Sequence, residues 1–183
     1  MNLEPGTLEA KAARIKLLLF DVDGVLTDGA VIIHGDGSES KRFGIRDGIA
    51  MVWAQRSGLK VGLLSARTSA TTPLRAAQLG ITLVHQGVMS KAAAYEQILV
   101  DERLSGDEVA FMGDDIVDLA VLERVGLSAA PADAVAEVRS RVDWVSSAPG
   151  GNGAARELVE TILRAQNLWE AVMTRYLREG ALS

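Results

Sequence analysis

Short apolar runs alternate with longer amphipathic segments along most of the chain. The apolar runs predict buried strands at 15–20, 59–64, 81–84, 108–112 and 126–129, with a weaker one at 142–145. The segments between them predict helices at 47–56, 68–79, 91–101, 116–124 and 133–139. Such alternation is typical of a parallel sheet with helices on both faces. We therefore predict a Rossmann-like, doubly wound α/β fold that forms a single domain over 1–183.

Two segments depart from this alternation. Residues 30–34 and 38–43 flank Gly35-Asp36-Gly37, a pattern that predicts a β-hairpin. Because the hairpin directly follows the first strand, where a helix is normally expected, we interpret 30–43 as an inserted flap. From about 149 to 183, a glycine-rich tail leads into one long helix or two stacked ones. Their apolar stripe is Leu158, Ile162, Ala165, Trp169, Val172 and Tyr176.

Composition narrows the possible functions. The formal net charge is -5, which argues against a nucleic-acid-binding surface. The chain contains no cysteine, which excludes a cysteine nucleophile, thiolate metal ligands and disulfides. No apolar run is long enough to cross a bilayer, and the first residues mix acids and bases without the apolar segment of a signal peptide. We expect a cytoplasmic protein with no membrane or nucleic-acid partner.

Carboxylates follow two of the predicted strands at their carboxyl ends. Asp21 and Asp23 come after the first strand, and Asp114, Asp115 and Asp118 come after the fourth. In an open parallel sheet, ligands bind beyond the carboxyl ends of the strands. A solvated turn or a helix cap explains one such acid equally well. Several acids close together need a positive partner, and a hard cation such as Mg²⁺ with its oxygen ligands would provide one.

Two further residues suit the binding of phosphate oxygens. Ser65 follows the second strand and Lys91 begins a helical segment, although each residue taken singly is more often a helix cap or a solvated surface residue. Taken in order, the set resembles the four motifs of the haloacid dehalogenase (HAD) superfamily. The set is Asp21-Val22-Asp23-Gly24, then Ser65, then Lys91, then Gly113-Asp114-Asp115 with Asp118. The resemblance implies a HAD-like core, magnesium and an aspartate nucleophile.

Other segments resemble one branch of that superfamily, the 3-deoxy-D-manno-octulosonate 8-phosphate phosphatase family. They are Asp21-Val-Asp-Gly-Val-Leu-Thr-Asp-Gly29, Arg46-Asp-Gly, Leu79-Gly-Ile, His85-Gln-Gly, Gly113-Asp-Asp-Ile-Val-Asp and Gly150-Gly-Asn-Gly-Ala-Ala-Arg-Glu. The resemblance implies that no large cap domain is present. It also implies that a hairpin flap and assembly into a homotetramer take the place of the cap.

The same resemblance implies a role for each acid. Asp21 is expected to be the nucleophile that forms an aspartyl-phosphate. Asp23 is expected to be the general acid, which protonates the leaving alcohol and then activates water. Magnesium is expected to bind Asp21, Asp114 and the backbone carbonyl of Asp23. Asp115 and Asp118 are expected to lie behind these ligands or to bind through water.

Basic and hydroxyl residues complete the expected site. Ser65 and Lys91 are expected to hold phosphate oxygens, whose charge must be stabilised in the transition state. Arg46 and Arg67 are candidates for binding a substrate carboxylate, because arginine pairs with carboxylates in a bidentate manner. An ordinary surface position is an equal alternative for either arginine taken singly.

The expected function is magnesium-dependent hydrolysis of 3-deoxy-D-manno-octulosonate 8-phosphate, a step of lipopolysaccharide biosynthesis. A nine-carbon sugar-acid phosphate or another small phosphometabolite stays open as substrate. The second motif reads Ser65-Ala66-Arg67 where the family usually has Thr-Gly-Arg, and Asn152 stands where an arginine is common. A catalytically silent assembly module is a third possibility, against which the presence of Asp21, Asp23 and Lys91 argues.

Overall fold

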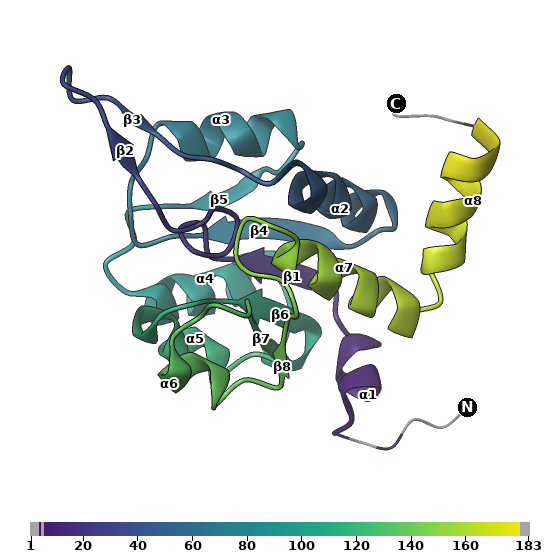
Figure 1. Cartoon of the computed structure of the whole chain (residues 1–183). Coiled ribbons are helices and arrows are strands. Elements are labelled where there is room, and N and C mark those ends of the chain that lie inside the picture. The colour runs from purple at the N-terminus through teal and green to yellow at the C-terminus, as the bar shows by residue number, and fades with distance from the viewer. Residues whose placement is uncertain (1–3, 5, 180–183) are drawn as a thin grey trace.

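A six-stranded parallel sheet forms the centre of the computed structural model, which describes residue 4 and residues 6–179 (Figure 1). The strand order is β5-β4-β1-β6-β7-β8, and every neighbouring pair is parallel. The strands are β1 (Leu17–Phe20), β4 (Lys60–Leu64), β5 (Leu83–His85), β6 (Val109–Met112), β7 (Leu127–Ala130) and β8 (Trp144–Val145). Because the order runs outward from β1 in both directions, the predicted doubly wound fold is confirmed.

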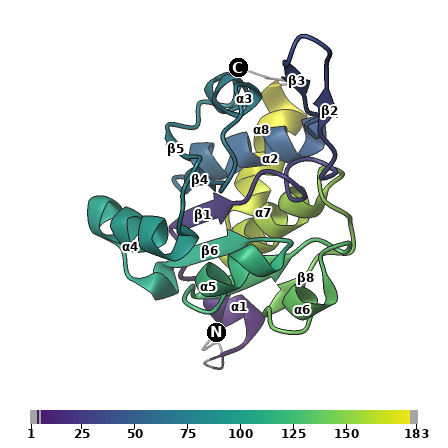
Figure 2. The same cartoon turned by 90° about the vertical axis from the view of Figure 1, so that its left-hand side faces the viewer.

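Helices cover both faces of this sheet, as Figure 2 shows for α7 on one side and α4 and α5 on the other. One face carries α1 (Leu8–Ala12), α2 (Ile45–Arg56), α3 (Thr71–Gln78) and α7 (Ala154–Ala165). The other carries α4 (Lys91–Glu102), α5 (Leu119–Leu122) and α6 (Ala136–Arg139). Short 3-10 turns, η1 (Gly106–Glu108) and η2 (Ile116–Asp118), precede β6 and α5. Within the described residues, no helix has the length and apolar character needed to cross a membrane.

The apolar run of β1 follows from burial on both faces. Leu18 and Phe20 belong to the core beneath α2 and α7, whereas Leu17 and Leu19 belong to the core beneath α4 and α5. All four side chains are fully buried. A strand covered on both faces has no solvent side, so its sequence lacks the usual polar alternation. This buried strand is a rigid base for the residues that follow it.

The flap is a short antiparallel hairpin of β2 (Ile32–Ile33) and β3 (Glu39–Ser40), which projects away from the sheet in Figure 1. Gly37 has a φ of 85°, which permits the tight turn between the strands. The strands are shorter than the predicted extended runs. A two-stranded ribbon without a covering layer has little to stabilise a longer ladder. The predicted insertion after the first strand is confirmed.

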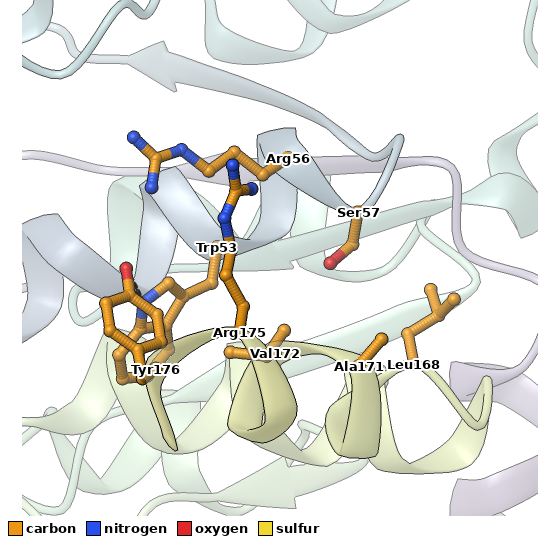
Figure 3. A pocket seen from close by; sticks show the side chains of 8 residues that line it. All are labelled: Trp53, Arg56, Ser57, Leu168, Ala171, Val172, Arg175 and Tyr176. Carbon is orange, nitrogen blue, oxygen red and sulfur yellow. Dashed lines mark hydrogen bonds between the residues drawn. The ribbon is translucent and has the colours of Figure 1, made fainter. Parts of the chain in front are cut away.

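The C-terminal stripe forms two helices, which was one of the two predicted alternatives. Asn167 has a φ of 59° between α7 and α8 (Trp169–Glu179), a conformation that asparagine tolerates better than most residues. The α8 helix packs on α2, where the Trp53 ring lies edge-on to Trp169 and Tyr176 at centroid distances of 5.6 and 6.0 Å. A hollow of about 310 Å³ lies between these helices, and the residues that line it, drawn in Figure 3, include none of the motif residues.

Candidate active site

The two acid clusters meet because their strands are neighbours. β1 and β6 pair in register up to Phe20 and Met112, and the backbone N–H of Asp21 donates to the carbonyl of Met112 at 3.0 Å. Gly24, with a φ of 87°, allows Asp114 to approach closely. A Cβ at this position would lie 2.1 Å from Oδ2 of Asp114. The first motif and the fourth motif therefore form one site.

Three carboxylates gather at this edge of the sheet. Oxygen atoms of Asp21, Asp114 and Asp118 lie within 4.8 Å of one another. Asp21 and Asp118 are buried, and the buried Oδ1 of Asp114 has no hydrogen-bond partner among the described residues. Burial, reinforced by Asp118, raises the pKa of Asp21 to about 6. Burial, reinforced by Asp21 and Asp118, raises the pKa of Asp114 to about 7.

Lys91 supplies a buried positive charge at the cluster. Its Nζ lies 2.9 Å from Oδ1 of Asp21 and 2.6 Å from Oδ1 of Asp118. Burial alone would lower the pKa of Lys91, but the two neighbouring carboxylates outweigh it and raise that pKa. One ammonium cannot neutralise three carboxylates. The unpartnered oxygen of Asp114 and the all-oxygen donor set therefore fit a hard divalent cation such as Mg²⁺.

Asp118 and Asp115 differ in their surroundings. Oδ2 of Asp118 accepts hydrogen bonds from the backbone N–H groups of Asp114 and Asp115, at 3.0 and 3.3 Å. With Oδ1 bound to Lys91, both oxygens of Asp118 hold other parts of the site in place. Asp115 is exposed, and its Oδ1 accepts from the N–H of Ile116 at 2.7 Å, which caps η2. The structure thus places Asp118 in the carboxylate group and Asp115 outside it.

Ser65 directly follows β4, at the same sheet edge as this group. The strand pairs with β1 as far as Leu63 and Phe20, so Ser65 falls just beyond the level of Asp21. The serine is buried, and its Oγ accepts a hydrogen bond of 3.2 Å from the N–H of Arg67. The second motif therefore reaches the same sheet edge as the first. Its predicted contact with phosphate stays a prediction.

The two predicted carboxylate-binding arginines are placed differently. Arg67 is half-exposed, and its guanidinium lies 3.0 Å from Oε2 of Glu39 and 3.9 Å from Oδ2 of Asp23. Arg46 is exposed in the first turn of α2, and its side chain makes no hydrogen bond or ion pair with another described residue. The structure brings Arg67, and not Arg46, into contact with the acids of the site. Both substrate roles stay predictions.

The flap contributes two charged residues that sequence reasoning missed. Nζ of Lys41 lies 2.8 Å from Oδ1 and 2.9 Å from Oδ2 of Asp23, and its side chain is only 1% exposed. Glu39, two residues earlier, pairs with Arg67. Glu39 and Lys41 are two positions apart on an extended segment, so their side chains face the same side. This spacing was the signal in the sequence that both could reach the site. Charged residues on a hairpin equally suit a solvated edge, so this signal was not decisive.

A long-range helix cap was also missed. The buried carboxylate of Asp47 accepts hydrogen bonds from the N–H groups of Gly153 and Arg156, at 3.1 and 3.0 Å. These groups belong to the start of α7. In the loop before it, the N–H of Gly151 donates to the carbonyl of Val25 at 2.9 Å. The glycine-rich tail therefore packs on the loop that carries Asp23.

Comparisons with known proteins show the family to which this chain belongs. The family model of haloacid dehalogenase-like hydrolases matches residues 54–158. The 3-deoxy-D-manno-octulosonate 8-phosphate phosphatase KdsC of Escherichia coli K12 is 41% identical over 157 residues, which cover 86% of this chain and 84% of that protein.

Two solved structures are similar along nearly their whole length. A probable YrbI family phosphatase from Pseudomonas syringae superimposes with a TM-score of 0.92 and 42% identity, covering 93% of this chain and 97% of that one. The 3-deoxy-D-manno-octulosonate 8-phosphate phosphatase of Moraxella catarrhalis, solved with magnesium, phosphate and KDO, has a TM-score of 0.90 and 33% identity. That match covers 92% of this chain and 97% of the other. The chain belongs to the 3-deoxy-D-manno-octulosonate 8-phosphate phosphatase family of haloacid dehalogenase-like hydrolases.

Proposed function

We propose that this protein is a Mg²⁺-dependent phosphatase that hydrolyses 3-deoxy-D-manno-octulosonate 8-phosphate to the free sugar acid and phosphate. The observation that carries the proposal is the group of Asp21, Asp114 and Asp118, in which Asp21 and Asp118 are buried and which Lys91 balances only in part. Support comes from the relatives. The E. coli protein bears the name of this phosphatase, and the M. catarrhalis structure holds magnesium, phosphate and KDO.

The metal would be held by Asp21 and Asp114, together with the backbone carbonyl of Asp23 that the family resemblance implies. Asp118 would keep Asp114 and Lys91 in position, since its two oxygens bind the backbone of one and the ammonium of the other. When bound, Mg²⁺ supplies positive charge that stabilises the phosphoryl oxygens during transfer. Asp115 would affect the metal only from behind its direct ligands or through a water molecule.

The chain's own residues divide the reaction into two steps. A carboxylate oxygen of Asp21 attacks phosphorus, the ester P–O bond breaks, and Asp23 gives a proton to the departing sugar oxygen. Asp23 then removes a proton from water, whose oxygen displaces the carboxylate of Asp21 and releases phosphate. Lys91 and Ser65 bind phosphoryl oxygens throughout and stabilise their charge.

Selection of the sugar requires groups beyond the phosphate. Arg67 is half-exposed beside Asp23, so its guanidinium is placed to meet a carboxylate on the substrate. A neutral sugar phosphate bound over Arg67 would shield the guanidinium from water without offering it a carboxylate, which would disfavour such substrates. A nine-carbon sugar-acid phosphate is the second candidate substrate. It is favoured by Asn152, which cannot supply the charge that an arginine would.

The proposed assembly is a homotetramer in which flaps of neighbouring subunits pair. Ile32 and Ile33 on β2 are 61% and 77% exposed, an arrangement that suits burial against another subunit. The hairpin also has unpaired edges that a second hairpin would satisfy. Location in the cytoplasm stays a prediction. A role in lipopolysaccharide biosynthesis fits the proposed substrate and stays a prediction as well.

Steady-state kinetics on three substrates test the proposal. We expect kcat/KM to be highest for the eight-carbon acid phosphate, lower for a nine-carbon acid phosphate and lowest for glucose 6-phosphate. Arg67→Ala should lower kcat/KM for the acids and spare a generic aryl phosphate. Arg14→Ala, on an exposed residue that pairs with Asp107, is the matched control. Equal efficiency on glucose 6-phosphate would contradict the proposed carboxylate recognition.

A further inference from the structure

One flap residue, Lys41, is buried against Asp23. Its ammonium lies within 2.9 Å of both carboxylate oxygens, and only 1% of its side chain is exposed. The Asp23 side chain is 18% exposed, so the acid stays open to the space in which a substrate would bind. Lys41 thus contacts the acid from the flap and not from the sheet.

The neighbouring residue shows that this placement is specific. Arg42 carries the same charge one position later, yet its side chain is 85% exposed and pairs with Asp28. Removing an ammonium from water is costly unless a close partner compensates. The burial of Lys41 is therefore explained by its contact with Asp23, whereas Arg42 makes only a surface ion pair.

We infer that Lys41 is a positioning residue for the reaction, and this inference rests on the proposed general-acid role of Asp23. Asp23 follows the last strand residue by three positions and precedes Gly24, so the backbone alone does not fix its side chain. Arg67 is its other cationic neighbour, at 3.9 Å. Lys41 holds the carboxyl group toward the leaving oxygen and adds positive charge where negative charge develops.

The chemistry gives this role a signature that depends on the leaving group. A sugar alkoxide is a poor leaving group, so the breaking P–O bond requires the proton from Asp23. A nitrophenolate leaves readily without that proton. Loss of a residue that positions Asp23 should therefore slow the first step for the sugar phosphate and leave it nearly unchanged for p-nitrophenyl phosphate.

Four variants test the inference in the full-length protein with Mg²⁺. For Lys41→Met we expect kcat/KM on the sugar-acid phosphate to fall by roughly 10- to 100-fold, against less than about threefold on p-nitrophenyl phosphate. Lys41→Arg should restore part of the difference. Arg42→Met, the matched control, should change neither value. Asp23→Asn should show the same selective loss as Lys41→Met, in stronger form.

The ratio of kcat/KM values on the two substrates decides the outcome, because partial unfolding lowers both values equally and cancels in the ratio. An unchanged ratio in Lys41→Met, with a changed ratio in Asp23→Asn, would overturn the inference and leave the proposed function intact. An unchanged ratio in Asp23→Asn would instead show that Asp23 is not the general acid. The inference about Lys41 would then fail as well. A selective loss in Arg42→Met equal to that of Lys41→Met would also overturn the inference.

Discussion

The carboxylate of Asp47 accepts a hydrogen bond of 3.0 Å from the backbone N–H of Arg156, which lies 109 residues further along the chain. A second bond from the N–H of Gly153 completes the cap of α7. The cap fixes the glycine-rich tail, which packs so closely on the first-motif loop that a Cβ at Gly150 would lie 1.8 Å from the carbonyl oxygen of Gly24. Asp47 thus connects the start of α2, the tail and the loop of Asp23.

Removal of this cap should destabilise the protein. We expect Asp47→Ala to lower the free energy of unfolding by about 1–2 kcal/mol, because two N–H groups at the helix start lose their acceptor. The free energy of unfolding of Asp47→Asn should lie between those of wild type and Asp47→Ala, since the amide keeps one acceptor oxygen. Urea denaturation midpoints measure the effect. The exposed Asp101 gives a control, Asp101→Ala, which should stay within about 0.5 kcal/mol of wild type. Equal stability of both alanine variants would contradict the cap.

Lys91 should matter to stability as well as to turnover. Without metal, Lys91→Met should cost roughly 3–5 kcal/mol at pH 8, because it leaves buried carboxylates uncompensated. The cost should shrink at pH 5, where the raised pKa values of Asp21 and Asp114 keep both groups largely protonated. Chemical denaturation in chelator at the two pH values measures this difference. Lys60→Met breaks the more exposed ion pair with Glu102 and should cost less than about 1 kcal/mol. A loss that does not depend on pH would count against the charge argument.

Metal binding should depend on pH in a definite direction. The pKa values of Asp21 and Asp114 in the metal-free protein, about 6 and about 7, exceed their ordinary value of 3.8. Unfolded chains therefore release these protons first, and metal-free stability should fall as pH rises from about 4 to about 7. Mg²⁺ must displace the same protons, so its stabilising effect should grow over that range and then level off. Thermal unfolding with Mg²⁺ or chelator between pH 5 and 8 checks both trends. Stabilisation that is greatest at pH 5 would contradict them.

The flap should control assembly through its exposed isoleucines. Replacing Ile32 and Ile33 by aspartate should dissociate the proposed tetramer, because a charge cannot be buried there without a partner. Light scattering should show wild type at four times 19.4 kDa and the double variant well below that mass. Leu177→Asp, at an equally exposed leucine of α8, is the control and should keep the wild-type mass. A wild-type protein that is fully active as a monomer would contradict the proposed role of the flap in assembly.

The sequence predicted those parts of the fold and site that depend on local pattern. Asp21, Ser65 and Asp114 could be placed because the first two directly follow apolar strands, Asp114 follows another after one glycine, and parallel strands end at one edge. Lys41 could not, since the direction of a two-stranded flap is set by tertiary contacts. The cap by Asp47 joins segments 109 residues apart, which no local pattern reveals. The break at Asn167 interrupts a stripe whose periodicity continues across it, and α1 is too short to produce a period.

The proposed function depends above all on transfer of the phosphoryl group to Asp21 with the help of Mg²⁺. Phosphate release from 3-deoxy-D-manno-octulosonate 8-phosphate should be followed for wild type and Asp21→Asn, each with Mg²⁺ and with chelator. We expect turnover only in wild type with Mg²⁺ and a loss of about 1,000-fold or more in the variant, which should stay folded. Substantial release by folded Asp21→Asn, or undiminished release by wild type in chelator, would contradict the account.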